Sequence, residues 1–497
     1  MLRMTNKKIM LMTTFIVFIL MTTIPISGLR ADPTPVSTDF DPLVDISVTV
    51  TINKIRAFDK VDWQLLKREY VDRNSDPDFF VKVIINGEEF TSPVWPNTKY
   101  IYDPQWSATL NVPDDVEFVN VVIQLWDANE SGAPDKLCDI SPDTGSTSDS
   151  KDVELTYSIK TGHWSGDDSI GDPSGYGRLN GCDDGSIYKH ESDAELWFNI
   201  NQTDYDGDGI PYWMEVNEYG TDPTVDNRGE DADADGVPIE WEWNWGYNPT
   251  VGEAHSTLDS DADGLNNLEE YRTSQWGSDP FRKDLFVELD QMEASPTGET
   301  STLPNGSKEL LYTTYNRQNL VYHLDDGTWA GTGSDMIPFD NLTVADWSGH
   351  DELSAIYETY FLHGDPNNWR LGVFHYGVII YQSSLVNGNM FGSNRFQISS
   401  HGMEKKASIP WLNRDVVYAS AYMHETGHTL AIFPIGGHNQ FSEYPWQLGW
   451  WFWRPYKSCM NYGYMYTTVD YSDGSRGLRD FNDWVNMDLT SFQSLST

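Results

Sequence analysis

The stretch AYMHETGHTLAIF, which runs from Ala421 to Phe433, decides the fold of the C-terminal part of this chain. It contains His424 and His428, and because residues four apart lie on one face of an α-helix, both imidazoles can bind the same metal ion. Glu425 lies one position further around the helix, where its carboxylate can take a proton from a water molecule. The pattern therefore predicts a metal-binding helix that also carries a general base.

The residues around this motif favour the same helix. Apolar residues lead in from Val416, and Asn413 or Asp415 stands where an N-cap is expected. Pro434 and the pair Gly436-Gly437 follow the motif and end the helical pattern.

A catalytic zinc site needs three protein ligands and one open position. His438 lies ten residues beyond His428, after the Gly436-Gly437 turn, which can bring the chain back under the helix. Glu443 is the alternative, because zinc peptidases of the thermolysin type use a glutamate downstream of the motif. The sequence thus predicts zinc bound by His424, His428 and a third residue, either His438 or Glu443, with His438 preferred.

Further along, CMNYGYMY at 459–466 places Met460 two residues before Tyr462. Together with HETGH, this segment resembles the metzincins, zinc endopeptidases in which HExxHxxGxxH binds the metal and a methionine-containing turn lies beneath it. The likeness covers about residues 283–464. It implies that Met460 is structural and that Tyr462 binds zinc or stabilises the oxyanion during peptide hydrolysis.

The chain departs from the metzincin pattern after the second histidine. Ala431 stands where the family has a glycine, and Pro434 stands where the family has its third histidine. An insertion of about four residues carries the third ligand to His438.

Strands alternate with helices on both sides of the motif. Buried strands are predicted in KDLFVELDQM (283–292), NLVYHL (319–324) and RLGVFHYGVIIYQ (370–382), and helices over 307–318, 351–362 and 482–494. This alternation predicts an α/β (α+β) layer packed on the motif helix.

Three acidic loops precede this region. DYDGDGIPYWME, DADADGVPIEWE and DSDADGLNNLEE begin at Asp204, Asp231 and Asp259, so their starts are 27 and 28 residues apart. Each fits D-x-D-x-D-G-x5-E, in which carboxylates at positions 1, 3, 5 and 12 bind calcium and the glycine makes a sharp turn. The expected calcium ligands are Asp204, Asp206, Asp208 and Glu215; Asp231, Asp233, Asp235 and Glu242; and Asp259, Asp261, Asp263 and Glu270.

The first part of each repeat is too short for paired flanking helices. The repeats therefore resemble thrombospondin type 3 repeats more than EF-hands. This resemblance implies a spacer made rigid by about three or more structural calcium ions.

Residues 43–200 alternate apolar and polar residues in short runs, separated by Gly, Pro, Asn and Asp clusters. Strands are predicted in DISVTVTINKIRAF, FFVKVIIN, WSATLNV, FVNVVIQLWD, VELTYSIK and ELWFNIN. The pattern predicts an antiparallel β-sandwich.

Three segments of this region, SDPDFFVKV, DPQWSATL and VVIQLWDANESGAPD, resemble the calcium- and lipid-binding sandwich domain of protein kinase C. In that family, loop carboxylates at one end of the sandwich bind calcium, and the matching positions are Asp76, Asp127, Asn129 and Asp135. The family usually has aspartate where this chain has an asparagine. A plain sandwich with acidic turns is the alternative interpretation.

The start of the chain, Lys7-Lys8 and the apolar run from Ile9 to Ile26, predicts a secretory signal peptide over 1–31, followed by a spacer over 32–42. An uncleaved signal anchor is the alternative. No later stretch approaches the ~20 apolar residues that span a bilayer. Cys138 and Cys182 are candidates for a disulfide in an oxidising compartment, which leaves Cys459 over.

Acidic side chains outnumber basic ones by 76 to 32, which gives a net charge of −44. Such a surface repels nucleic acid, so a DNA- or RNA-binding role is not expected. Protein or peptide substrates are the expected partners, and association with a cell surface is compatible with the sequence.

These patterns predict a multidomain, secreted or cell-surface protein with a sandwich at 43–200, calcium repeats at 201–282 and a zinc endopeptidase domain at 283–497. Glu425 is the expected general base. The alternative is a non-catalytic, calcium-binding cell-surface or adhesion protein whose peptidase fold is degenerate. A third interpretation, a lipid-binding protein, depends on the sandwich alone.

Overall fold

The computed structural model describes residues 39–58, 60–62, 67–69, 75–129, 134–144, 151–187, 192–329, 333–346 and 351–493. The expected signal peptide and most of the spacer lie outside the described residues. Residues 39–497 form one compact unit.

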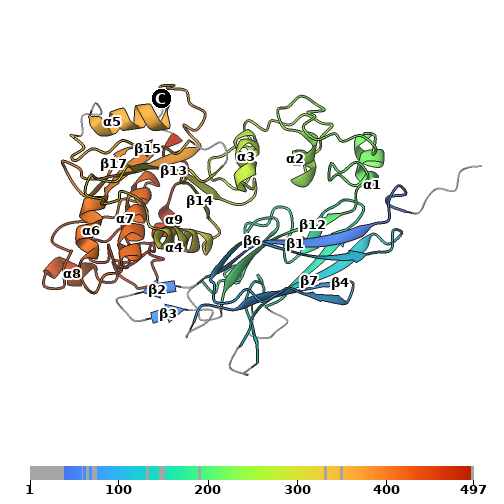
Figure 1. Ribbon diagram of the computed structural model, residues 1–497, viewed down its shortest axis with the longest axis horizontal. Helices are drawn as coiled ribbons and strands as arrows, with labels where there is room; N and C mark the ends of the chain where they lie inside the picture. The colour runs from blue at the N-terminus through green and yellow to red at the C-terminus, as the bar shows by residue number, and fades with distance from the viewer. Residues whose placement is uncertain are drawn as a thin grey trace, which may run out of the picture. The chain divides into compact units, whose positions relative to one another are not determined.

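The N-terminal region contains two antiparallel sheets (Figure 1). The first has the order β11 (Arg178–Asn180), β12 (Ala194–Gln202), β1 (Ser47–Ala57) and β6 (Tyr100–Asn111). The second has the order β10 (Trp164–Gly166), β9 (Val153–Ser158), β7 (Phe118–Asp127), β4 (Phe79–Ile85) and β5 (Glu88–Thr91), with β8 (Lys136–Leu137) beside β7. A separate hairpin joins β2 (Lys60–Asp62) to β3 (Lys67–Glu69).

Apolar residues from the two sheets form one shared core, as alternating strands of a sandwich require. Val48, Val50 and Ile52 alternate inward along β1, and a bulge between Ile52 and Lys54 shifts its register. The predicted antiparallel sandwich is therefore confirmed.

The predicted disulfide between Cys138 and Cys182 is wrong, because both cysteines are free and separately buried. Cys138 packs in the sandwich core, whereas the Cys182 thiol lies 3.5 Å from the Asp193 carboxylate.

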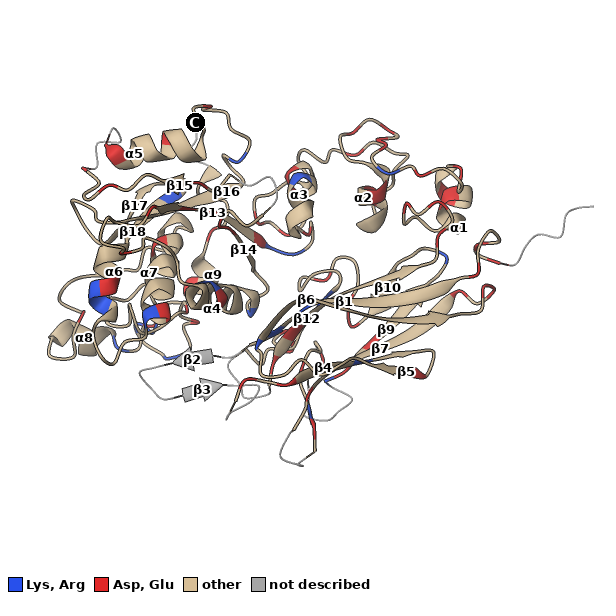
Figure 2. Ribbon diagram, in the orientation of Figure 1, with Lys and Arg blue, Asp and Glu red and all other residues tan. Residues whose placement is uncertain are grey.

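Short helices follow each acidic loop. They are α1 (Tyr212–Met214) with η2 (Glu215–Tyr219), α2 (Ile239–Asn244), and α3 (Asn267–Thr273) with η3 (Ser274–Trp276). Figure 2 shows acidic residues along the segments around α1, α2 and α3. A small aromatic core around Val237, Trp241 and Trp245 supports this region.

The C-terminal region is built on a mixed sheet. Parallel strands β14 (Val321–Asp325), β13 (Asp284–Met292), β16 (Phe374–Ile380) and β18 (Arg395–Ser399) lie in that order, and antiparallel β17 (Gly388–Gly392) forms the edge. The short strand β15 (Met336–Ile337) pairs with β13.

Helices cover both faces of this sheet (Figure 1). Side chains along β13 alternate between the two faces of the sheet. Leu285 and Val287 pack on one face with α4 (Asn305–Asn316) and α7 (Arg414–Thr429). Phe286 packs on the other face with α5 (Glu352–Ile356) and η4 (Tyr357–Phe361). Burial on both faces explains why these strands are apolar almost throughout. The expected alternation of strands and helices is thus present.

Three further helices complete this region, namely α6 (Ser400–Ala407), α8 (Leu448–Trp453) and α9 (Asp483–Asn486). The predicted helix over 482–494 is wrong in length, because α9 ends at Asn486 and Met487 adopts an extended conformation.

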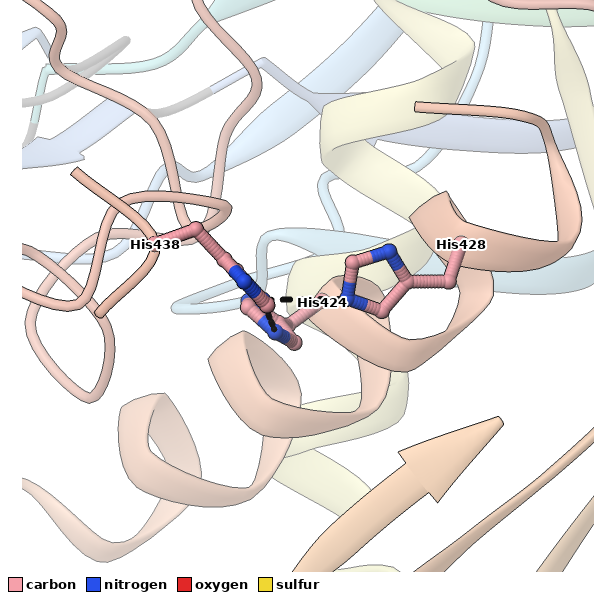
Figure 3. A group of neighbouring side chains, drawn as sticks. All are labelled: His424, His428 and His438. Atoms are coloured by element: carbon pink, nitrogen blue, oxygen red, sulfur yellow. Dashed lines mark hydrogen bonds between the residues drawn. The ribbon is translucent and has the colours of Figure 1, made fainter. Parts of the chain in front are cut away.

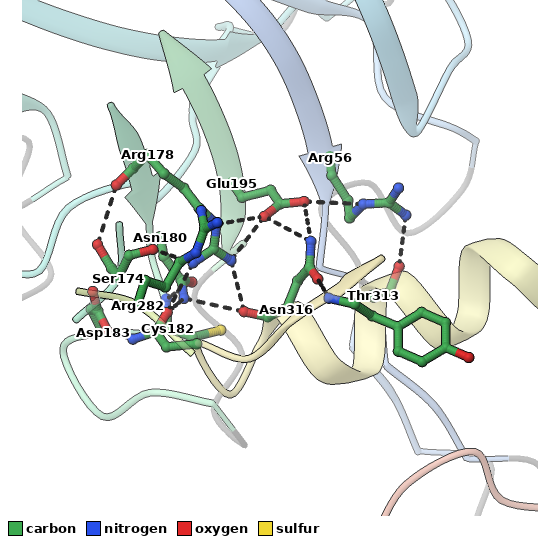
Figure 4. Close-up of polar contacts among 12 residues, drawn as sticks. Arg56, Ser174, Arg178, Asn180, Cys182, Asp183, Glu195, Arg282, Thr313 and Asn316 are labelled. Carbon is green, nitrogen blue, oxygen red and sulfur yellow. Dashed lines mark hydrogen bonds and ion pairs between the residues drawn. The ribbon is translucent and has the colours of Figure 1, made fainter. Parts of the chain in front are cut away.

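A buried ionic network joins the sandwich to α4 (Figure 4). Glu195 on β12 lies 3.1 Å from the Arg56 guanidinium and accepts hydrogen bonds from Arg178 at 2.9 and 3.0 Å. The Asn316 amide also donates to Glu195, and its backbone carbonyl accepts from Arg178 at 2.8 Å. Because all four side chains are buried, these contacts fix α4 against the sandwich.

Candidate metal centre

Three histidine side chains converge at the C-terminal end of α7 (Figure 3). The Nε2 atom of His438 lies 3.1 Å from Nε2 of His424 and 3.2 Å from Nε2 of His428. A tetrahedral ion with nitrogen ligands at about 2.0–2.1 Å needs nitrogen atoms roughly 3.3 Å apart. The separations in this structure are therefore close to those of a three-histidine metal site.

The outer ring nitrogens fix which atoms face the centre. His424 Nδ1 donates to the carbonyl oxygen of Cys459 at 2.9 Å, and His428 Nδ1 donates to that of Ile432 at 3.1 Å. Both Nε2 atoms then carry lone pairs, and one N–H of His438 can satisfy only one of them. A bound cation would satisfy all three nitrogen atoms.

Burial favours the neutral form of these imidazoles. Desolvation, reinforced by the neighbouring His428 and His438, lowers the pKa of His424 well below its usual value. Desolvation likewise lowers the pKa of His428 to about 4. Neutral imidazole is the form that binds a metal ion.

The end of α7 is a Schellman turn, which positions His428. The N–H of Ile432 donates to the carbonyl of Gly427, and the N–H of Ala431 donates to that of His428. Ala431 has φ 59°, in the left-handed region that favours glycine. The departure of this chain from the metzincin pattern at residue 431 therefore leaves the turn intact.

Met460 packs beneath the motif helix. It is fully buried, and a Cβ placed on Gly427 would lie 2.7 Å from its sulfur atom. The residue before Met460, Cys459, supplies the carbonyl group that orients His424. Met460 is therefore a packing residue under α7, and it is not among the groups that face the centre.

Glu425 is buried beside the histidines, on the side of β17. A Cβ on Gly388 would lie 2.5 Å from its Oε1 atom, so only glycine permits this close approach. Desolvation raises the pKa of Glu425 to about 8. A carboxyl group with a raised pKa near neutrality is suited to take up and return a proton.

Glu443, the alternative third ligand, does not join the histidine group. Its Oε1 atom lies 3.2 Å from Lys406 Nζ in an ion pair. Tyr462 packs on the centre instead, with ring centroids 4.5 Å from His438 and 5.7 Å from His424.

A cavity of about 360 Å³ opens beside the centre. It is lined by Leu385, Val386, Asn387, Gly388, Lys406, His424, Glu425, Gln440, Glu443, Tyr462, Met465 and Tyr466. Glu425, Tyr462 and the start of β17 therefore share one solvent-connected space with the metal-facing histidine His424.

Three other histidines of this region, His323, His375 and His401, have partners away from the centre. His323 Nε2 lies 2.8 Å from Asp284, His401 Nδ1 lies 3.3 Å from Glu299, and His375 contacts the Thr429 hydroxyl at 2.9 Å.

Each acidic loop has the backbone of a cation-binding turn. The glycines at loop position 6, Gly209, Gly236 and Gly264, have φ between 96° and 109°. Carboxylate oxygen atoms within each loop lie close enough together to hold an ion. Groups whose ligand atoms lie within 4.8 Å of one another include Asp204, Asp208 and Glu215; Asp231, Asp233 and Asp235; and Asp259, Asp261 and Asp263.

The glutamate at position 12 of each loop is buried, with no more than 1% of its surface exposed. Desolvation, with repulsion from the loop aspartates, raises the pKa of both Glu215 and Glu242 to about 8. The same causes raise the pKa of Glu270 well above its usual value. In each loop, at least one oxygen of this glutamate has no hydrogen-bond partner in the described part of the chain. A cation would satisfy these atoms.

The motif template missed two residues that reach the loops from the following segment. The backbone N–H groups of Asn227 and Glu253 donate to Asp208 and Asp235. Among the described residues, Asn227 Oδ1 and Glu253 Oε2 are buried without a partner. Both residues lie outside the twelve-residue motif, so the template did not include them. Asn227 follows Asp208, and Glu253 follows Asp235, by a similar number of residues.

In the sandwich, the four candidate calcium ligands are held in local contacts. Asp76 lies 3.3 Å from Lys99 Nζ, Asp127 accepts from the Asp78 N–H, and Asp135 accepts from the Asn129 N–H. A calcium site there stays a prediction.

Comparisons with known proteins give no relative of this chain. No protein-family model matches the sequence, and no curated protein matches it. Among solved structures, it is similar to human GIVD cytosolic phospholipase A2 (13% identity, TM-score 0.18), over 32% of this chain and 16% of that one. It is also similar to a C2 domain protein from Ramazzottius varieornatus (12% identity, TM-score 0.19), over 36% of this chain and 95% of that one. At these scores, neither likeness bears on the function.

No helix in the described part of the chain is long and apolar enough to cross a membrane.

Proposed function

We propose that this protein is a secreted zinc-dependent endopeptidase that calcium stabilises. The observation that supports this most directly is the convergence of three imidazole Nε2 atoms, one of them on His424, which lines a cavity together with the buried carboxyl group of Glu425. His424, His428 and His438 would hold the ion. When bound, zinc would polarise the scissile carbonyl and increase the acidity of water.

Glu425 would act as general base and then as general acid. It takes a proton from the attacking water as the oxygen–carbon bond forms, and it returns the proton to the amine nitrogen as the carbon–nitrogen bond breaks. Its burial and raised pKa suit both steps. Tyr462, whose ring is tilted by 50° against that of His438 and lines the cavity, would donate a hydrogen bond to the developing oxyanion.

The substrate would be an extended peptide that adds to the edge strand β17. Among the described strands, β17 pairs with β18 alone, so its outer edge offers backbone groups to a further strand. Gly388, at the start of β17, brings this edge next to Glu425.

The test compares wild type, Glu425→Gln and a matched control, Glu358→Gln, an exposed glutamate on η4. Casein hydrolysis is measured in calcium, and zinc is counted by mass spectrometry. We expect Glu425→Gln to lose activity by about 10²–10⁴-fold with zinc unchanged, and the control to keep both.

Equal hydrolysis by Glu425→Gln and wild type would exclude Glu425 as the base. Absence of zinc from the wild type would leave the non-catalytic, calcium-binding surface protein as the better description.

A further inference from the structure

One acidic loop contains a nitrogen donor that the calcium template does not include. His255 lies after the second loop, and its Nε2 atom is 3.2 Å from Asp235 Oδ2 and 3.8 Å from Glu242 Oε1. The imidazole is completely buried, and its Nε2 atom has no hydrogen-bond partner among the described residues. Asp235, Glu242 and His255 together form a group whose ligand atoms lie within 4.8 Å of one another.

The surroundings hold the His255 ring in this orientation. Trp241 and Tyr247 both pack edge-on against it, with ring centroids 5.8 and 5.0 Å away. His255 Nδ1 lies 2.9 Å from the amide of Asn267. The ring is thus held by two aromatic side chains, which stack on each other, and at its outer nitrogen, as imidazole ligands of metal ions commonly are.

The Asn267 amide indicates which nitrogen carries the proton. With its Nδ2 toward the ring, Asn267 Oδ1 is buried without a partner in the described part of the chain. The two ends of an amide are assigned from their hydrogen bonds, and turning this one over lets Oδ1 accept from Nδ1–H. In that arrangement His255 Nε2 carries a lone pair that faces the two carboxylates.

We propose that the second loop binds a divalent transition-metal ion of the zinc class, through Asp235, Glu242 and His255. Calcium takes oxygen ligands, whereas a mixed imidazole and carboxylate set suits zinc and its neighbours in the first transition row. Glu253 Oε2, 3.8 Å from His255 Nε2, supplies a fourth donor on the same side. The carboxylate groups Asp204, Asp208 and Glu215 of loop one, and Asp259, Asp261 and Asp263 of loop three, offer oxygen atoms, so calcium remains the expected ion there.

The experiment isolates this site from the catalytic centre. The full chain carries His424→Ala and His428→Ala, which removes the candidate catalytic ligands whether or not the protein is a peptidase. It is equilibrated with millimolar calcium and a small excess of zinc, and zinc per chain is counted after removal of free metal. We expect one zinc in this background, and less than a tenth of that after His255→Gln is added. The loss of affinity should exceed the roughly 10–100-fold that removal of an outer partner causes.

The control replaces His163, a half-buried histidine of the sandwich that packs against Trp243 of the second repeat. His163 Nε2 contacts the Trp243 carbonyl at 2.8 Å, and His163→Gln should leave the zinc count unchanged. If the background binds no zinc, or if His255→Gln keeps it, the proposal is wrong. Should His255→Gln fail to fold, zinc-edge anomalous diffraction from the wild type decides, since a peak within bonding distance of His255 Nε2 supports the proposal and its absence overturns it.

Discussion

His428 Nδ1 lies 3.1 Å from the carbonyl oxygen of Ile432, so the turn that ends α7 orients a metal-facing imidazole. Ala431 holds this turn in the left-handed region, where a Cβ is unfavourable. We expect Ala431→Gly to raise the free energy of unfolding by about 0.5–1 kcal/mol, measured by urea titration. Ala355→Gly on the exposed face of α5 should instead lower it by about 1 kcal/mol. A destabilised Ala431→Gly would show that the turn needs the methyl group.

The third zinc ligand can be identified by metal content. Because His438 faces the other two imidazoles while Glu443 pairs with Lys406, we expect His438→Ala to lower zinc affinity strongly and Glu443→Gln to leave it near the wild-type value. Zinc titration with a competing chelator measures both. The opposite ranking of the two variants would transfer the ligand role to Glu443.

Removal of calcium should reverse the pH dependence of stability in the acidic loops. Without a cation, the raised pKa of Glu215 means that the folded state binds more protons than the unfolded state between about pH 4.5 and 8. When EGTA has removed calcium, the free energy of unfolding should therefore fall as pH rises through this window. Addition of millimolar calcium should restore the lost free energy of unfolding. Thermal unfolding at pH 5.5 and 8 in each buffer tests this. Glu215→Gln should show a weaker fall, and equal unfolding temperatures with and without calcium would contradict calcium binding.

Glu195 should be essential for stability. Replacement of Glu195 by Gln removes the negative charge that lies between the buried guanidinium groups of Arg56 and Arg178. Removal of one partner from a buried ion pair lowers the free energy of unfolding by about 3–5 kcal/mol. Urea unfolding measures the loss. Glu309→Gln is the control, because Glu309 is 23% exposed and contacts only Arg56 of this pair, so it should cost less. Equal effects of the two variants would show that burial of Glu195 is not what matters.

His375 should make the protein sensitive to acid. Desolvation lowers the pKa of His375 to about 3, whereas the unfolded chain has a histidine pKa near 6.5. Between these values the unfolded state binds more protons, so stability is complete above about pH 6.5 and falls as pH decreases toward 3. At pH 5 the loss should be about 2 kcal/mol. His375→Gln should lose less between pH 7 and 5, and identical losses would exclude His375 as the cause.

Local patterns predicted much of this structure, because their causes are local. The helix around HETGH begins at the Asn413 cap, as its sequence indicated, and the glycines of the acidic loops adopt the positive φ that the template requires. Five of the six predicted sandwich strands agree with observed strands to within two residues at each end, but β6 begins at Tyr100, six residues before the predicted Trp106, and β5, β10 and β11 were not predicted.

Contacts between distant segments could not be predicted from one sequence. Nothing near Glu195 indicated that Asn316, from another region, would bind it, and nothing near Asp235 indicated His255. The choice between His438 and Glu443 likewise depended on the path of the chain after Pro434. The cysteine pairing was wrong because shared membership of a segment does not bring two thiols together.

The antiparallel direction of β17 gives a bound peptide a defined polarity. Gly388 pairs with Ile398 and Gly392 with Arg395, so β17 starts beside Glu425 and runs away from it. A peptide that pairs antiparallel with β17 runs back toward Gly388. Its residues on the amino-terminal side of the cleaved bond would then lie along β17, and those on the carboxyl-terminal side would pass Asn387 and Val386. Contacts with β17 would therefore determine which substrate residues are preferred before the cleaved bond. Contacts with the loop that precedes β17 would determine which residues are preferred after it.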